Sequence, residues 1–451
     1  MLKKHLQIFI FGLLSLLTAC ATVPKDFEQI PSSAWPTPET TQLGRFFAKD
    51  APSDNELSGV FLLDEPRTAL QIRLGFASLA EKTLDLQYYI WKDDTTGGLL
   101  LHRVLQAADR GVQVRILIDD ISHSGRDDLY ATVDAHPNVQ VRLFNPTGNR
   151  NLGRNLNFVL YKRKLDRRMH NKIFLADSAV TVLGGRNIGD DYFGIDSTLN
   201  FRDLDVLAVG PAAKEASEAY DSYWNSRVAV PIAVLRQETV LPEDLKRLRG
   251  ELDNRLQVLD IPYPVPVSFE EVETSLIALR QALIWGQAKV IVDPIARLTD
   301  DSESAFVKMG RELNENIKQA LVIQSPYMVP ASYGVDFIAS LIARGVHVRM
   351  LTNSLMSNDH LLVHAHYMKY RKPLINAGAE LYELRSDAAL LEFLQQEKNT
   401  ASSVRAGLHT KALVADDHTT MIGSYNMDPR SLELNSEIAP GISRVPAPHP
   451  R

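Results

Sequence analysis

Two short stretches, far apart in the chain, carry side chains that together suit phosphate chemistry. Each stretch reads H-x-K-x-x-x-x-D, and the six motif residues are His170, Lys172, Asp177, His409, Lys411 and Asp416. Beyond its aspartate, each copy continues at the same distance with a G-[GS]-x-N segment, which ends at Asn187 in the first copy and at Asn426 in the second. One copy alone is a weak signal because His, Lys and Asp are common. Two extended copies with the same spacing indicate a shared site.

The spacing within each copy determines which side chains share a face. Residues two apart on a β-strand point to the same side, so each histidine is expected beside its lysine. The small residues that follow let the backbone approach a bound group closely, and the asparagine amide can donate hydrogen bonds to that group. An imidazole, an ammonium group and an amide together suit a tetrahedral anion, so the sequence predicts a phosphate site.

The elements around the two motifs recur in the same order along the chain. A strand around Gln87 matches one around Gln324, and Arg110 at a helix end matches Arg344. Each pair is separated by nearly the same length of chain as the two motifs, which indicates an internal duplication. Strands that alternate with helices predict an α/β protein of two duplicated halves, each a mixed β-sheet flanked by helices.

The size and charge of the chain narrow the possible functions. At 451 residues the chain is long enough for two such halves, each with its own core. A net charge of −6 argues against a general nucleic-acid binder. His360, His364 and His366 lie close together in the sequence, but they match no zinc-binding pattern, so no metal is expected.

The N-terminal residues have the pattern of a targeting segment. A positive start is followed by an apolar run over 8–17, which is too short to span a bilayer and leads to Cys20, the only cysteine. Residues 1–19 resemble a bacterial lipoprotein signal that is cleaved before Cys20, which then carries the lipid; an ordinary secretory peptide is the alternative. Ala21 after the cysteine favours the outer membrane. The expected location is therefore the bacterial envelope, with the chain lipid-anchored and facing the periplasm.

Composition divides the rest of the chain. Residues 20–55 are rich in proline and predict a tether. The first half is expected over 56–230, a connector over 231–290 and the second half over 291–437. In the first half, an apolar strand and a helix follow Asp203. Residues 438–451, by contrast, contain four prolines and read as neither strand nor helix. The sequence therefore predicts that the closing strand and helix of the second half are missing.

The paired motifs resemble those of the phospholipase D superfamily. The surrounding stretches resemble its bacterial cardiolipin synthase-like lipoprotein branch, at residues 86–91, 134–139, 167–172 and 223–226. This resemblance implies that the halves pack about a pseudo-twofold axis and bring both motifs into one cleft. It also implies that no cofactor takes part.

The resemblance further implies a role for each motif residue. One histidine attacks a phosphodiester to form a phosphohistidine, and the other gives its proton to the leaving alcohol. By analogy His170 is the nucleophile and His409 the general acid and base, although the reverse assignment stays open. The side chains that would hold the phosphate oxygens are those of Lys172, Lys411, Asn187 and Asn426.

Four carboxylates accompany the motifs. Glu437, which follows His409, occupies the position that the family uses to orient an imidazole, and Asp203 is its counterpart after His170, at a slightly longer spacing. Asp177 and Asp416 complete the motifs, and we expect them to brace the motif turns instead of transferring protons.

Three functions are consistent with these features. The first is a phospholipase D-type phosphatidyltransferase that moves a phosphatidyl group between phospholipids such as phosphatidylglycerol. The second is a phosphodiesterase that hydrolyses phospholipid or nucleic acid, and the third is an inactive, truncated, lipid-anchored binding protein. The lipid anchor and the acidic net charge favour phospholipid over nucleic acid. The oligomeric state is left open.

Overall fold

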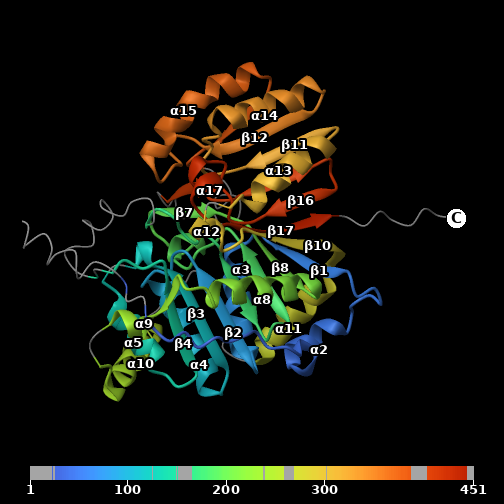
Figure 1. The fold of residues 1–451 in the computed structure, drawn as a ribbon. Coiled ribbons are helices and arrows are strands. Elements are labelled where there is room, and N and C mark those ends of the chain that lie inside the picture. Colours follow the sequence, from blue (N-terminus) through green and yellow to red (C-terminus); the bar gives the residue numbers. More distant parts are fainter. Residues whose placement is uncertain are drawn as a thin grey trace, which may run out of the picture.

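Two stacked halves share a single sheet in the computed structural model, with the second half above the first in Figure 1. The residues that the structure describes are 23, 26–123, 125–148, 150, 165–236, 239–257, 269–300, 302–387 and 404–443. The sheet has 15 strands, and β1 (Ser58–Leu63) of the first half pairs antiparallel with β10 (Ile284–Val292) of the second half at its centre.

The first half extends outward from β1. Its strands follow in the order β8 (Asp205–Val209), β6 (Val180–Gly184), β5 (Ile173–Ala176), β2 (Thr83–Tyr88), β3 (Gln113–Asp119), β4 (Val139–Phe144) and β9 (Ala229–Pro231). Only β2, β3 and β4 are mutually parallel. The helices are α3 (Pro66–Leu79), α4 (Thr95–Asp109), α5 (Asp127–Asp134) and α8 (Pro211–Trp224), with short η2 (Asp120–Ser122) and η3 (Asp190–Tyr192). Two apolar cores result, because α3 and α4 cover one face of the sheet and α8 covers the other.

The second half repeats this order outward from β10. Its strands are β17 (Ile438–Ser443), β16 (Thr419–Ile422), β15 (Ala412–Ala415), β11 (Ala320–Gln324), β12 (His347–Asn353) and β13 (Glu380–Leu384), with β11 to β13 parallel. The helices are α12 (Arg297–Asp300), α13 (Ala305–Asn316), α14 (Ala331–Ala343), α15 (Leu361–Asn376) and α17 (Pro429–Glu433). The matching strand orders confirm the α/β fold of two duplicated halves, and the antiparallel β1–β10 pair lies where a twofold axis would relate them.

The same local signal ends the equivalent helices of the two halves. Helix α4 is capped by Arg110 and followed by Gly111, whose φ is 94°, and α14 is capped by Arg344 and followed by Gly345, whose φ is 89°. A left-handed residue after the last turn suits glycine and turns the chain back toward the sheet. This is the physical reason for the glycine in each Arg-Gly pair.

The prediction that the second half lacks its closing strand is wrong. Strand β17 follows Glu437 directly and pairs antiparallel with both β10 and β16, as β8 pairs with β1 and β6 in the first half. Pro440 is tolerated because the ladder with β16 begins one residue later, at Gly441, so no bond to β16 is lost at the proline. The predicted absence of a closing helix concerns residues 444–451, which lie outside the described ranges.

The predicted tether over 20–55 is wrong for most of its length. Gln29 donates a hydrogen bond to the carbonyl of Ser226 at 2.7 Å, and α2 (Gln42–Ala48) buries Leu43 and Phe47 in the first core. A short η1 (Pro38–Thr40) precedes α2. The prolines thus shape a segment that packs on the first half. Cys20 lies outside the described residues.

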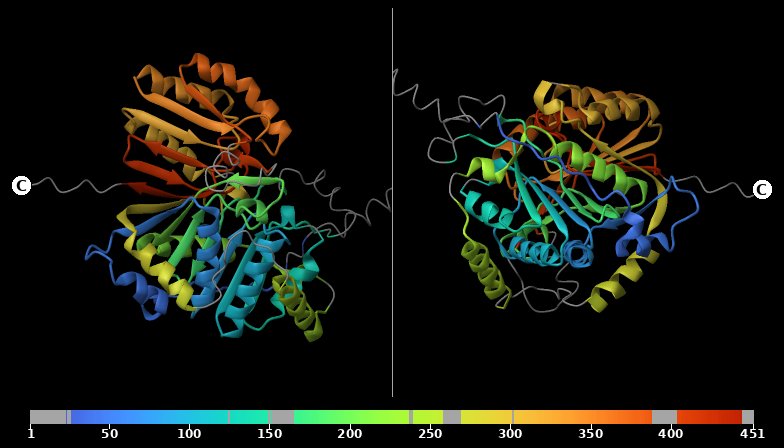
Figure 2. Two further views of the ribbon diagram at one scale, coloured as in Figure 1. Left: turned by 180° about the vertical axis from the view of Figure 1, so that it is seen from behind. Right: turned by 60° about the horizontal axis from the view of Figure 1, so that its bottom comes forward.

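The connector is shorter than predicted. It carries α9 (Ile232–Leu235), α10 (Pro242–Gln257) and α11 (Phe269–Gln281), and β10 then begins inside the predicted 231–290 range. Helix α10 packs on α4 and α5, and α11 packs on α3, so both cover the first half (Figure 2). Among the helices that the structure describes, none has the length and apolarity needed to cross a membrane.

Candidate active site

Each motif begins just before a central strand and ends in a tight turn. His170 and Lys172 precede β5, and His409 and Lys411 precede β15. The β5–β6 and β15–β16 turns begin at the motif aspartates, which have φ of 56° at Asp177 and 51° at Asp416. Each carboxylate accepts three backbone amides from the start of the neighbouring strand, which are those of Glu81, Lys82 and Thr83 in the first half and of Lys318, Gln319 and Ala320 in the second. The two aspartates therefore hold the motif turns against the sheet.

Replacing Asp177 with alanine is expected to lower the free energy of unfolding by about 2–4 kcal/mol. Three amides lose their acceptor, and alanine tolerates the left-handed backbone poorly. Asp416 is partly exposed, so water can replace its carboxylate and Asp416→Ala should destabilise the chain less. Urea unfolding of both variants measures the difference. A variant that kept its stability and lost turnover would place Asp177 in the chemistry.

Each motif histidine is hydrogen-bonded to a carboxylate from the other half. Nδ1 of His170 lies 2.8 Å from Oε2 of Glu437, and Nδ1 of His409 lies 2.5 Å from Oδ2 of Asp203. All four side chains are buried. Each histidine thus takes its partner from the other half, a pairing that the linear spacing of the motifs does not reveal. In each histidine the second ring nitrogen, Nε2, stays available for chemistry.

Backbone pairing between the two halves positions each histidine beside the carboxylate of the other half. Strand β14 (Arg405–Leu408), which leads into His409, runs parallel to β7 (Leu199–Arg202), which leads into Asp203. In the same way Met169 forms a bridge with Ser436, the residue before Glu437. The chain segment before each histidine therefore lies beside the segment before the other half's carboxylate.

Both motif lysines are buried beside their histidines. Nζ of Lys172 donates to the carbonyl of His170 at 2.6 Å, and Nζ of Lys411 donates to the carbonyl of His409 at the same distance. Tyrosine rings flank both imidazoles, with Tyr89 4.9 Å from His170 and Tyr192 5.1 Å from His409 between ring centroids.

The two predicted asparagines are also buried but have different partners. Asn187 accepts from the amide of Ile90 at 3.1 Å and donates to the hydroxyl of Tyr192 at 2.9 Å, which places it next to the His409 site. Asn426 has a buried side-chain oxygen without a hydrogen-bond partner in the described structure. A buried polar atom of this kind commonly marks a site that a ligand or water completes.

Burial and mutual repulsion lower the pKa of every basic group in the site. Burial, together with Lys172 and Lys411, lowers the pKa of His170 to about 4 in spite of Glu437. Burial and the two lysines also hold the pKa of His409 well below its usual value. Burial lowers the pKa of Lys172 to about 7 and that of Lys411 to about 8. The hydrogen bonds from His170 to Glu437 and from His409 to Asp203 bring the two halves together in one site, so the charges of each half also lower the pKa values of basic groups in the other half. An anion between them would relieve this repulsion.

The two carboxylates differ in their environments. Burial alone would raise the pKa of Glu437, but His170, Lys172 and the hydroxyl of Ser424 lower it. For Asp203, burial outweighs Lys411 and Arg186 and raises the pKa. The repeat explains part of this difference, because Gly185 stands where the second copy has Ser424. A Cβ on Gly185 would lie 2.2 Å from Oδ1 of Asp203, whereas the Ser424 hydroxyl donates to Glu437 at 2.5 Å.

Sequence reasoning missed two residues that position the histidines. Asp119 ends β3 and accepts the amide of Met169 at 2.8 Å, while Asn353 ends β12 and accepts the amide of Leu408 at 2.8 Å. Each therefore holds the residue before a motif histidine. Asn353 lies as far along the chain from Asp119 as Arg344 lies from Arg110, so the repeat was the signal that could have identified them.

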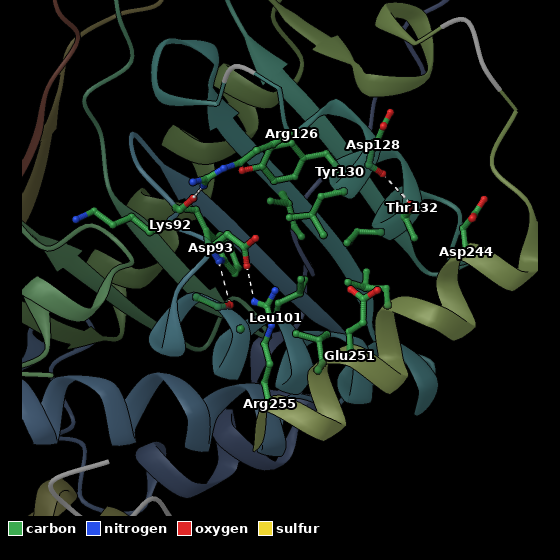
Figure 3. Close-up of a pocket in the computed structure, with 18 of the residues that line it drawn as sticks. Lys92, Asp93, Leu101, Arg126, Asp128, Tyr130, Thr132, Asp244, Glu251 and Arg255 are labelled. Carbon is green, nitrogen blue, oxygen red and sulfur yellow. Dashed lines mark hydrogen bonds and ion pairs between the residues drawn. The ribbon is translucent and has the colours of Figure 1, made fainter. Parts of the chain in front are cut away.

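A separate cavity of about 270 Å³ lies between β3, α4, α5 and the connector helix α10 (Figure 3). Its floor is apolar, and its rim is charged and ion-paired, for example between Arg255 and Asp93 at 2.6 Å. No motif residue lines it. Over the described ranges, no three His, Cys, Asp or Glu side chains are grouped to hold a metal ion.

Two duplicated halves that each contribute an H-x-K-x-x-x-x-D motif to one buried site define a phospholipase D architecture. The family model described as "Cardiolipin synthase, PLD-like domain" matches residues 76–224 and 312–445. The chain belongs to the phospholipase D superfamily, and within it to the cardiolipin synthase-like enzymes.

Relatives over most of the chain agree with this assignment. Cardiolipin synthase C of Escherichia coli K12 is 37% identical over 390 residues, which cover 84% of this chain and 80% of that protein. An uncharacterised Helicobacter pylori J99 protein is 32% identical over 416 residues, covering 89% of this chain and 79% of that one. The crystal structure of phosphatidylserine synthase from Haemophilus influenzae Rd KW20 shares the fold, with a TM-score of 0.57 at 14% identity over 90% of this chain and 87% of that one.

Proposed function

We propose that this enzyme transfers a phosphatidyl group from one phospholipid to an alcohol of another through a phosphohistidine intermediate. The observation that carries this proposal is the meeting of two imidazoles and two ammonium groups, one of each from either half, in one buried site. The name of the Escherichia coli relative, cardiolipin synthase C, supports phosphatidylglycerol as an acceptor.

His170 is the proposed nucleophile. With Nδ1–H donating to the Glu437 carboxylate, Nε2 carries the lone pair that attacks phosphorus. The P–N bond forms as the bond to the first alcohol breaks, and protonated His409 gives that alcohol its proton. The acceptor hydroxyl then loses its proton to His409 and attacks phosphorus, which releases His170. Lys172 and Lys411 hold the non-bridging oxygens, whose negative charge grows in both steps.

The unlike carboxylates support this division of roles. Glu437 receives hydroxyl donors from Ser424 and Ser431, which favour its charged form and keep Nδ1 of His170 protonated. Asp203 lacks a comparable hydroxyl pair among its described contacts, and burial raises its pKa, which makes it a more basic partner for His409 than an ordinary aspartate. A more basic carboxylate supports an imidazole that must bind and release a proton.

The rate should depend on pH in a bell-shaped manner. His170 attacks only when neutral, above its pKa of about 4, so kcat/KM should fall at lower pH. His409 donates its proton only when it is charged, and the lysines hold the phosphate only when they are charged. Both requirements make kcat/KM fall again as pH rises, no later than through about 7 to 8. The apparent pKa values of the two limbs of this pH profile belong to the coupled group of side chains and not to single residues. A pH series with monomeric substrate measures them, and a constant kcat/KM up to about pH 9 would contradict the role of the lysines.

Mass spectrometry of lipids after incubation with phosphatidylglycerol tests the activity. New cardiolipin supports transfer, and phosphatidic acid alone would indicate hydrolysis. The absence of both products would favour a non-catalytic binding protein. The closing strand that this last alternative took to be missing is present as β17.

We also propose that the chain is lipid-anchored through Cys20 at the outer membrane and faces the periplasm. The support is the sequence pattern around Cys20. Incorporation of labelled palmitate that is lost in Cys20→Ser would agree with this anchor, and equal labelling of both chains would exclude it.

A further inference from the structure

The outer face of α15 and the loop before it are unusually apolar. Six of the thirteen most exposed large hydrophobic side chains in the described residues lie between 355 and 375. They are Leu355, Met356, Leu361, Leu362, Met368 and Ile375. Leu362 is 80% exposed and Leu361 is 68% exposed, which is high for leucine in a folded protein. We call these six residues the apolar rim.

Among its described residues, the first half has no such surface. Helix α5, which occupies the equivalent place between β3 and β4, packs against α9 and α10. Helix α15 packs on α14 and β13, and lies on the outside of the second half in Figure 1. In the part of the chain that the structure describes, no connector helix covers its outer face.

The loop that presents the rim is firmly held. Ser357 is buried, and its hydroxyl donates to the carbonyl of Leu384 at 3.0 Å. The amide of His360 donates to the side chain of Asn358 at 2.8 Å. Leu355 and Met356 on one side of these anchors, and Leu361 on the other, are therefore exposed by an ordered loop.

This loop also adjoins the active site. A Cβ on Gly407, two residues before His409, would lie 3.1 Å from the carbonyl of Ser357. Asp359, between the two groups of rim residues, accepts from the hydroxyl of Tyr327 at 2.9 Å. The charge of Asp359 is close enough to influence His409. The rim thus lies beside the second-half side of the catalytic site.

The charge of α15 indicates what the rim contacts. The helix has no Asp or Glu, and its exposed side includes Lys369 and Lys372. Exposed leucine and methionine beside exposed lysine on one helix suit the surface of an anionic bilayer, where apolar groups enter the acyl boundary and ammonium groups stay among the headgroups.

We propose that the apolar rim docks the enzyme on an anionic phospholipid bilayer and brings the bilayer to the active site. This inference rests on the proposed function for its substrate, a phospholipid that must reach the site from the bilayer. The rim would support the lipid anchor by orienting the enzyme, a task that attachment through Cys20 alone does not perform.

Fluorescent labelling tests the contact. The chain from Ala21 on retains every described residue and has no cysteine, so Leu362→Cys introduces a single site for an environment-sensitive nitrobenzoxadiazole label. With vesicles of phosphatidylglycerol and phosphatidylcholine, its emission should rise at least about twofold and shift to shorter wavelength as the label leaves water. The matched control is Leu241→Cys, which should not respond. Leu241 lies directly before α10 and is 57% exposed. Equal responses at both positions, or none at 362, would overturn the proposal.

A second variant links the contact to turnover. Leu361→Ser with Leu362→Ser should weaken vesicle binding at least about tenfold and lower turnover of vesicle lipid similarly, because two exposed leucines no longer enter the bilayer. Turnover of a short-chain phosphatidylglycerol kept monomeric should not change. An equal loss on both substrates would overturn docking as the role of the rim, as would a label at 362 that brightens by self-association without vesicles.

The binding measurement is independent of catalysis. It can be repeated in His170→Ala, which should bind vesicles as the unsubstituted chain does. Vesicle binding without any lipid product would refute the proposed function and leave the rim intact. Product formation with an unresponsive label at 362 would refute the rim and leave the function intact.

Discussion

Replacing either His170 or His409 with alanine should lower phosphatidyl transfer by at least about a thousandfold. The first substitution removes the atom that bonds to phosphorus, and the second removes the proton donor for the leaving alcohol. Because the two imidazoles act in one site, the double variant should be little worse than either single variant. Initial rates of cardiolipin formation from phosphatidylglycerol measure all three chains.

A trapping experiment separates the two roles. The chain with His409→Ala keeps the nucleophile and should accumulate an acid-labile phosphoryl adduct when the donor carries a good leaving group that needs no proton. The chain with His170→Ala should form none. An adduct in His170→Ala alone would reverse the assignment. Substantial turnover in either single variant would exclude a shared site.

The second large effect is expected for Asp203→Asn. The carboxylate accepts a hydrogen bond from Nδ1–H of His409, whereas an asparagine amide can donate a hydrogen bond to that nitrogen. The imidazole would then carry its proton on Nε2, the atom that must receive protons from the acceptor. Transfer should fall between about a hundredfold and ten-thousandfold, as for other misoriented catalytic imidazoles. Nitrogen-15 NMR of His409 reports the tautomer directly.

Asp177→Asn is the matched control for this variant. Asp177 belongs to the same half as Asp203, but its carboxylate faces backbone amides and no imidazole. Its substitution should affect stability and leave the tautomer of His409 and the rate constant unchanged. If Asp203→Asn changed the tautomer of His170 and left that of His409 unchanged, the pairing of each histidine with the carboxylate of the other half would be wrong.

The features predicted well from the sequence are those encoded by local spacing. The offsets of Gln87, Arg110 and His170 from their second copies predicted two like halves because side-chain periodicity and helix ends are short-range properties. The resemblance of the motifs to the phospholipase D superfamily was confirmed by the family match. The position of each lysine beside its histidine follows from residues two apart in the extended chain just before a strand.

The features missed depend on contacts between distant segments. No local sequence pattern predicts that β14 lies beside β7. For this reason no local pattern predicts that Asp203 is the partner of His409. Pro440 suggested an interrupted strand, but whether a proline breaks a sheet depends on which neighbour its position faces. The proline-rich segment before β1 was read as a tether because composition does not show that Phe47 reaches the core.

The exchanged carboxylates also have an evolutionary consequence. A half-length chain would carry a complete motif but no carboxylate for its own imidazole, so two identical copies would have to form a homodimer to complete either pair. Within a homodimer any substitution changes both pairs at once. Fusion into one chain removes this restriction, and Gly185 with Asp203 can then differ from Ser424 with Glu437. Covalent duplication thus allows a symmetric framework to hold two chemically unequal histidines.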